Sequence, residues 1–272
     1  MGTAIVTDFR VGMADVLRTM RAKSPLVHCI TNYVAMNMAA NATLAIGASP
    51  AMVHAEEEAG DFAMLADALT INIGTLSFPW LKGMLAAAKA AQQSNKPWVL
   101  DPVAHQATAF RRDAIDQLLA HQPTIIRGNA SEILALSGST SHARGVDSRD
   151  AVEAAENGAT QLARRYGAVI AVTGPIDFLT DGKRSIRFSG GSPLMPRITA
   201  MGCAQTCVMG AMVGARPDVP FEAAAVALAV FKRAGELAAM EATGPGSFQW
   251  RFIDALASPD ERLLPTSLAS GS

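Results

Sequence analysis

Short apolar runs alternate with longer amphipathic segments along most of the chain. Runs rich in Val, Ile and Leu predict strands, and the segments between them, with apolar residues three and four positions apart, predict helices. The expected strands are 26–30, 51–53, 68–73, 97–100, 124–126 and 168–172. The expected helices are 33–45, 55–66, 80–93, 111–121, 131–136, 150–166, 204–214 and 221–243. This alternation indicates βαβ units in a mainly parallel sheet, and therefore an α/β fold.

One segment departs from this alternation. Two short runs, 176–180 and 185–188, flank Asp181-Gly182, which is a strong signal for a two-stranded hairpin. We interpret the Gly/Ser/Arg-rich stretch 137–149 as a mobile surface loop and the polar segment from about residue 258 as a frayed tail. No repeat or linker divides the sequence, so residues 1–272 are predicted to form a single domain.

The composition narrows the range of possible functions. With 23 basic and 24 acidic residues well mixed along the chain, the net charge of −1 gives no electrostatic reason to expect nucleic acid or an anionic membrane as a partner. Charged residues interrupt every apolar run before it reaches the roughly 18 residues of a membrane span. The three cysteines, Cys29, Cys203 and Cys207, lack the spacing of a metal site or a disulfide framework, which predicts a soluble protein of the reducing cytoplasm.

Polar residues that directly follow strands are the first candidates for a functional site. In open parallel sheets, ligands bind beyond the carboxyl ends of the strands. The candidates selected by this rule are Thr31-Asn32, Asn72 with Thr75, Asp101, Arg127-Asn129 and Thr173-Gly174.

A small-residue turn at 199–203 opens an apolar, glycine-rich helix. Backbone N–H groups at a helix start bind anions, because they lack partners and carry the positive end of the helix dipole. The dipole is also expected to lower the pKa of the Cys203 thiol from about 8.5, which would let the thiolate accept a proton from a substrate hydroxyl. The alternative is a helix start packed tightly on the sheet, with Cys203 as a small buried residue.

The other candidates also have two interpretations each. Asp101 suits a magnesium ion bound through water, or a simple cap of the next turn. Asn129 and Glu132 have the spacing of a capping box, whereas a functional interpretation places Arg127 on nucleotide phosphates and Glu132 near the metal. Thr173 suits phosphate binding, although ordinary strand ends look similar. The sequence contains no Walker loop and no protein-kinase signature.

The order of these segments resembles the hydroxyethylthiazole kinase family. The resemblance covers about residues 25–243, and the first of its motifs is distinctive. The matching motifs are VHCITNYV at 27–34, GASPAM at 47–52, NIGTL at 72–76, LDPV at 100–103, IRGNASE at 126–132, VTG at 172–174 and Gly202-Cys203. The resemblance implies a ribokinase-like three-layer sandwich, with a mainly parallel central sheet and helices on both faces.

The resemblance also implies an activity. ATP would phosphorylate the primary hydroxyl of 4-methyl-5-(2-hydroxyethyl)thiazole, with Mg²⁺ as cofactor, in thiamine biosynthesis or salvage. Active sites would lie at the subunit interfaces of a homotrimer, to which helix 33–45 could contribute. By matching positions, the implied roles are substrate binding for Asn32, Val34, Met52 and Ala200; ATP binding for Arg127 and Thr173; metal binding for Asp101 and Glu132; an anion hole at Gly202 and Cys203; and catalysis by Cys203.

Two departures from the family pattern bear on activity. Ala200 and Met201 stand in the anion-hole turn where the family usually has Gly and then Thr or Ala, and an alanine there would cost roughly 1 kcal/mol if the backbone needs a positive φ. Ala104-His105-Gln106 replaces Gly-Ala-Gly after Asp-Pro-Val. The alternatives to a thiazole kinase are therefore a related kinase for another small heterocyclic alcohol and a catalytically impaired paralogue that binds thiazole or nucleotide.

Overall fold

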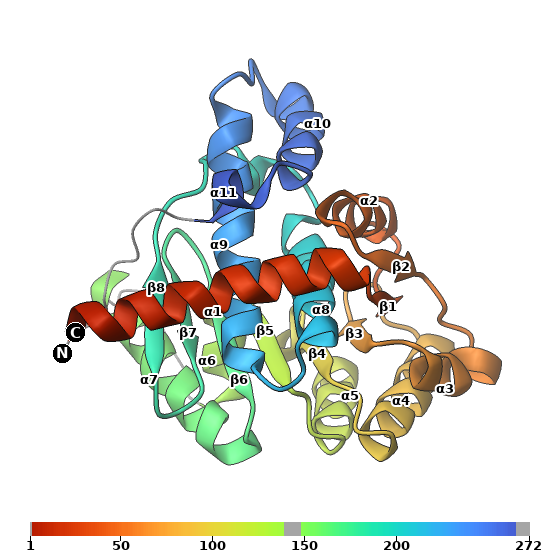
Figure 1. Ribbon diagram of the computed structural model, residues 1–272. Coiled ribbons are helices and arrows are strands. Elements are labelled where there is room, and N and C mark those ends of the chain that lie inside the picture. The colour runs from red at the N-terminus through yellow and green to blue at the C-terminus, as the bar shows by residue number, and fades with distance from the viewer. Residues whose placement is uncertain (1, 139–147, 265–272) are drawn as a thin grey trace.

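A central eight-stranded sheet organises the protein, whose computed structural model describes residues 2–138 and 148–264 (Figure 1). The strand order is β2-β1-β3-β4-β5-β6-β7-β8, with parallel pairing up to β6 and antiparallel pairing of β6, β7 and β8. The strands are β1 Leu26–Ile30, β2 Ser49–Ala51, β3 Ala68–Asn72, β4 Trp98–Asp101, β5 Ile125–Asn129, β6 Val169–Thr173, β7 Asp177–Thr180 and β8 Ser185–Phe188. The predicted parallel sheet and hairpin are confirmed.

Helices cover both faces of this sheet. The helices of one layer are α1 Gly2–Lys23, α2 Met36–Ile46, α8 Met201–Ala215, α9 Pro220–Ala239, α10 Pro245–Leu256 and α11 Asp260–Leu263. Those of the other layer are α3 Glu56–Leu65, α4 Phe78–Gln93, α5 Ala109–Leu119, α6 Ala130–Leu136 and α7 Ser148–Tyr166. Figure 1 shows α1 running across α9 and α8, on the side away from the sheet. The predicted three-layer sandwich is therefore confirmed.

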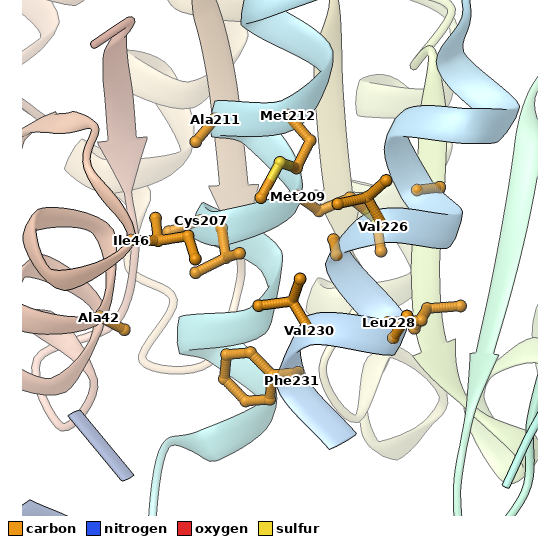
Figure 2. Close-up of a cluster of buried hydrophobic side chains, with 14 of the residues drawn as sticks. Ala42, Ile46, Cys207, Met209, Ala211, Met212, Val226, Leu228, Val230 and Phe231 are labelled. Atoms are coloured by element: carbon orange, nitrogen blue, oxygen red, sulfur yellow. The ribbon is translucent and has the colours of Figure 1, made fainter. Parts of the chain in front are cut away.

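The strands are apolar on both sides because each side packs against helices. Along β6, Val169 and Ala171 face the core under α8 and α9, whereas Ile170 and Val172 face the core under α3 to α7. In the first core, Figure 2 shows Ile46 of α2 on one side of α8 and side chains of α9 on the other. The two cores hold the strands in place, so the strand ends can carry polar groups in fixed positions.

Element boundaries differ from the predictions where side chains or prolines intervene. Helix α2 begins at Met36 instead of residue 33, because the Asn32 side chain and carbonyl both accept the N–H of Ala35 and close a turn first. The predicted helix 221–243 ends at Ala239, and Pro245 starts the separate helix α10. Helices α1 and α10 were not predicted.

The chain end is ordered further than predicted. Residues 258–264 include helix α11, in which Leu263 is fully buried, and Arg21 pairs with Asp260 at 2.6 Å. These contacts tie residues 258–264, the first part of the segment expected to fray, to α1; the rest of that segment, 265–272, lies outside the described residues. Of the predicted loop 137–149, residues 139–147 lie outside the described residues, and 148–149 belong to α7. Within the described residues, no helix has the length and apolar character needed to cross a membrane.

His28 on β1 gives the fold a pH-dependent contribution to stability. Its side chain is fully buried, its Nε2 donates to the Val53 carbonyl at 2.7 Å, and burial lowers its pKa from 6.5 to about 4. The unfolded chain binds this proton more readily, so stability is present above about pH 6.5 and is lost as the pH falls toward 4.

We expect His28 to remove about 2 kcal/mol of unfolding free energy between pH 7 and pH 5. Urea unfolding at the two pH values measures this loss. A His28→Gln variant, which does not titrate, should show a shallower dependence on pH. If the unfolding free energy depends on pH equally in the wild type and in His28→Gln, the assignment to His28 is contradicted.

Candidate active site

The candidate site lies where the carboxyl ends of the parallel strands meet the start of α8. Asn32 follows β1, while Asp101 ends β4 and Thr173 ends β6. Arg127, near the end of β5, directs its guanidinium toward α8. A Cβ on Gly202 would come within 2.6 Å of both terminal nitrogens of Arg127. The structure therefore brings these four predicted residues to one edge of the sheet, beside the turn at 199–203.

The predicted helix start is confirmed at Met201. Ala200 is the N-cap residue, with φ 65° and ψ 5°, and its side chain makes no capping hydrogen bond. The first N–H groups of α8 are therefore left uncapped by the residue before them, as an anion site requires. Gly202 is needed at the second helical position because Arg127 fills the space that a side chain would occupy.

Ala200 stands where the family usually has glycine, and it has the positive φ considered above for this position. Left-handed backbone costs an L-residue about 1–2 kcal/mol, whereas glycine adopts it freely but loses more entropy on folding. We expect Ala200→Gly to raise the unfolding free energy by about 0.5–1 kcal/mol in urea titrations. Ala40→Gly, inside α2, is the matched control and should lower it by about 1 kcal/mol. Equal losses in both variants would contradict strain at Ala200.

Ala104 belongs to the second segment that departs from the family pattern, and it also has a positive φ, 49°. The next residue, His105, is buried, and its Nδ1 lies 3.3 Å from the Pro102 carbonyl. Burial lowers the pKa of His105. This histidine packs within its own turn.

Asp101 is the most deeply buried charged group of the site. Its carboxylate is fully buried, and Oδ2 accepts hydrogen bonds from Asn72 at 2.7 Å and Thr206 at 2.9 Å. Burial raises the pKa of Asp101, and the Arg127 guanidinium, 3.5 Å from Oδ2, opposes that rise. Within the described residues, the buried Oδ1 has no hydrogen-bond partner, so one oxygen of this carboxylate keeps its full capacity to accept.

Glu132 lies near Asp101 but has a clear local role. Its Oε2 accepts the N–H of Asn129 at 2.8 Å, and the Asn129 side chain accepts the N–H of Glu132 at 2.9 Å. This is the capping box that the spacing predicted. Its Oε1 accepts the N–H of Ala104 at 3.0 Å, which ties α6 to the turn after β4.

Asp101 and Glu132 are the predicted ligands of a hydrated magnesium ion. They interact electrostatically, since Glu132 raises the pKa of Asp101, and the free Oδ1 of Asp101 is a hard oxygen donor. Glu132 uses both oxygens on backbone N–H groups, so it suits contact with a metal-bound water better than direct coordination. Within the described residues, no cluster of three or more His, Cys, Asp or Glu side chains could hold a metal.

Cys203 differs electrostatically from the prediction. The helix dipole was expected to lower the pKa of its thiol, but burial and the nearby Asp101 carboxylate raise that pKa to about 11. Hydrogen bonds from Asn32 and Asn72 and the charge of Arg127 act in the opposite direction without reversing the shift. The expected reactive thiolate was therefore wrong: the thiol is protonated at neutral pH.

A cavity of about 650 Å³ opens beside the start of α8. This volume is typical of small-molecule sites. Among its lining residues are Arg127, Thr173, Ala200, Gly202, Gln205 and Lys232. The cavity therefore joins the proposed ATP residues to the anion-binding turn.

The four predicted substrate residues are only partly brought together. Asn32 is buried and its Nδ2 donates to Cys203 Sγ at 3.3 Å, while Ala200 lines the cavity. Val34 is 60% exposed, and Met52 is half-buried at the edge of the core under α8. Asn32, Val34 and Met52 do not line the 650 Å³ cavity, so Ala200 alone of the four predicted substrate residues lies at it.

The search for polar residues after strands selected Asn72 but assigned it no role. The same search overlooked polar residues that lie on helices. Thr206 of α8 reaches Asp101, and Lys232 of α9 donates to the carbonyls of Gly174 and Pro175 at 3.0 and 3.1 Å. Thr206 and Lys232 lie inside long, mainly apolar helices, where isolated polar residues do not form a periodic pattern that would point to a site.

Comparison with known proteins identifies the family. The model of the hydroxyethylthiazole kinase family matches residues 17–261. The chain belongs to this family. A hydroxyethylthiazole kinase of Rhizobium etli is 65% identical over 248 residues, covering 91% of this chain and 96% of the relative. That of Rhizobium rhizogenes is 62% identical over 250 residues, covering 92% and 93%.

Solved structures of hydroxyethylthiazole kinase and related folds agree with this assignment. The hydroxyethylthiazole kinase structure from Pyrococcus horikoshii has a TM-score of 0.86 and 38% identity, covering 94% of this chain and 97% of that one. A ribokinase-like superfamily protein from Enterococcus faecalis has a TM-score of 0.65 and 13% identity, covering 93% and 95%. The second likeness concerns the fold alone, and the predicted ribokinase-like fold is confirmed.

Proposed function

We propose that this chain transfers the γ-phosphoryl group of ATP to the hydroxyl of 4-methyl-5-(2-hydroxyethyl)thiazole. Family membership supports the substrate. The observation that supports the chemistry is the start of α8, where uncapped N–H groups lie between the Arg127 guanidinium and the buried Asn32 amide. An anion held there would have the Arg127 cation on one side, and on the other Asn32 and Cys203, which are proposed to face the alcohol substrate.

Catalysis of this reaction depends mainly on positioning and charge. The transferring phosphoryl group carries charge on its equatorial oxygens, and little covalent work is left to the protein. In the proposed arrangement, Arg127 and Thr173 bind the nucleotide phosphates in the cavity. The N–H groups at Gly202 and Cys203 then stabilise the transferring group through the positive end of the α8 dipole.

Magnesium is the proposed cofactor, held through water by Asp101 and Glu132. When bound, it would neutralise phosphate charge that the protein cations leave uncompensated. The free Oδ1 of Asp101 supports this assignment. Thr206 and Asn72 fix the other oxygen, so the carboxylate is held in one orientation.

Cys203 is the proposed catalytic residue on the acceptor side. With a pKa of about 11, only about one thiol in ten thousand is ionised at pH 7. In a loose transition state the acceptor hydroxyl loses its proton late, so a base that is rarely ionised still contributes. Its sulfur is oriented by the Asn32 amide, 3.3 Å away, toward the side proposed for the alcohol.

An ATP-dependent turnover assay separates the alternatives. We expect ADP formation that depends on the thiazole alcohol. Turnover only with another heterocyclic alcohol, such as pyridoxal, would indicate a shifted substrate. Calorimetric binding of thiazole or ATP without turnover would indicate a catalytically impaired paralogue, as the departures at Ala200 and Ala104 allow.

A homotrimer with interfacial active sites is also proposed. Tyr33, Val34 and Leu44, in and just before α2, are 64%, 60% and 58% exposed, which leaves apolar side chains for a neighbouring subunit to cover. Sedimentation equilibrium tests the trimer directly. A role in thiamine biosynthesis and a cytoplasmic location stay predictions, and the three free cysteines, Cys29, Cys203 and Cys207, are compatible with a reducing compartment.

A further inference from the structure

Asn72 is the last residue of β3 and lies at the candidate site, next to Asp101. Asn72 is 2% exposed, donates to the Asp101 carboxylate, and accepts from Asn32, which also donates to the Cys203 thiol. We propose that Asn72 is a positioning residue, whose amide fixes the carboxylate on the metal side relative to the thiol on the acceptor side. This inference rests on the proposed function, because it assigns a role within the same phosphoryl-transfer site.

The orientation of the Asn72 amide is set by its neighbours. Oδ1 accepts the Asn32 side-chain N–H at 2.8 Å and the Gly74 backbone N–H at 2.9 Å. Two donors on one atom identify that atom as the oxygen. The Nδ2 group must then face the Asp101 carboxylate, to which it donates at 2.7 Å. The turn after β3 thus determines which way the amide points.

The Asn72 amide also determines which carboxylate oxygen stays open. Asn72 and Thr206 both donate to Oδ2 of Asp101, at 2.7 and 2.9 Å, and Arg127 is 3.5 Å from the same oxygen. Oδ1 is left buried without a hydrogen-bond partner in the part of the chain that the structure describes. Rotation of the carboxylate would break both hydrogen bonds, so Oδ1 is kept as the oxygen without a protein partner.

Asn72 is linked to the thiol through Asn32. The Asn32 side-chain N–H group donates both to Asn72 Oδ1 at 2.8 Å and to Cys203 Sγ at 3.3 Å. Asn72 therefore contacts the metal side of the proposed site directly and the acceptor side through Asn32. Loss of its amide should disturb the alignment of acceptor and metal, and leave the Arg127 side of the cavity intact.

Two variants separate positioning from packing. Asn72→Ala removes every hydrogen bond of the side chain. Asn72→Asp keeps the oxygen that Asn32 and Gly74 need, and replaces the donor with a second carboxylate oxygen that repels Asp101. We expect both to lower kcat by roughly tenfold or more, since residues that orient a metal ligand typically contribute about that much. Thr70→Val is the matched control: Thr70 is buried on the same strand, contacts Cys207 at 3.6 Å, and should leave kcat unchanged.

Calorimetry provides a readout independent of turnover. ATP affinity without magnesium should stay within about twofold of wild type, while the gain in affinity on adding magnesium should fall by about fivefold or more in Asn72→Ala. If ATP affinity falls equally with and without magnesium, Asn72 has a packing role only, and the inference is overturned. Wild-type kcat in Asn72→Asp would also overturn it, because the donor would then be dispensable.

The same experiments distinguish this inference from the proposed function. If the wild-type protein fails to phosphorylate the thiazole alcohol, the proposed function fails, whatever the variants do. If the wild-type protein is active and the Asn72 variants match it, only the positioning role fails. Thermal melting of each variant identifies any that do not fold, and the variant that does fold then decides the outcome.

Discussion

Replacing Arg127 with alanine is expected to raise the KM for ATP by about 100-fold or more, the equivalent of about 3 kcal/mol of charge-assisted binding. Arg127 lines the cavity, and its guanidinium lies against Gly202 at the helix start, where the phosphates are proposed to bind. Its removal also deprives the buried Asp101 carboxylate of a cation 3.5 Å away. We therefore expect unfolding free energy to fall by about 3 kcal/mol as well.

Arg21→Ala is the matched control for this prediction. Arg21 forms a comparable ion pair with Asp260 at 2.6 Å, but that pair joins α1 to α11. This variant should lose stability in urea and keep the wild-type KM for ATP. An unchanged KM for ATP in Arg127→Ala would remove Arg127 from the nucleotide site. Equal KM changes in both variants would show that lost stability, instead of lost contact, raises KM.

Replacing Cys203 with alanine is expected to lower kcat by about 100-fold, with ATP affinity within about twofold of wild type. The thiol lies on the proposed acceptor side, in contact with Asn32, whereas nucleotide binding is assigned to Arg127 and Thr173. Because the thiol pKa is about 11, its ionised fraction increases with pH. The ratio of wild-type to variant kcat should therefore increase from pH 7 to pH 9.

Cys207→Ala is the matched control, one helical turn further along α8. Cys207 is buried in the core beside Thr70, so its loss should reduce stability without changing kcat. Steady-state kinetics and calorimetric ATP affinity distinguish the two cysteines. Equal losses of kcat and ATP affinity in Cys203→Ala, with intact folding, would indicate that Cys203 is only structural.

The fold could be predicted because both sheet faces are buried. Strands such as β6, apolar on both sides, are continuous apolar runs in the sequence, and the Asp181-Gly182 turn identifies the hairpin. Helix α1 was missed although Met13, Val16, Leu17 and Met20 are buried at helical spacing. The start of α2 could not be located, because a long-range network fixes the Asn32 side chain that closes the preceding turn.

The candidate site was predictable in position and only partly in chemistry. The rule that ligands bind at strand ends selected Asp101, Arg127 and Thr173, and the structure brings them to one edge of the sheet, since parallel strands place their carboxyl ends together. It could not give the thiol pKa of Cys203, because the helix dipole is visible in the sequence but burial and the charge of Asp101 are not. The left-handed backbone of Ala200 was anticipated from the family pattern and is confirmed.

Product identification by ³¹P NMR tests the central claim most directly. The purified protein is incubated with ATP, magnesium and 4-methyl-5-(2-hydroxyethyl)thiazole. We predict loss of the γ-phosphate signal together with a new phosphomonoester signal that couples to the adjacent CH₂ protons. Loss of the γ-phosphate signal with only inorganic phosphate formed, or no change while the thiazole demonstrably binds, would contradict phosphoryl transfer to the thiazole alcohol.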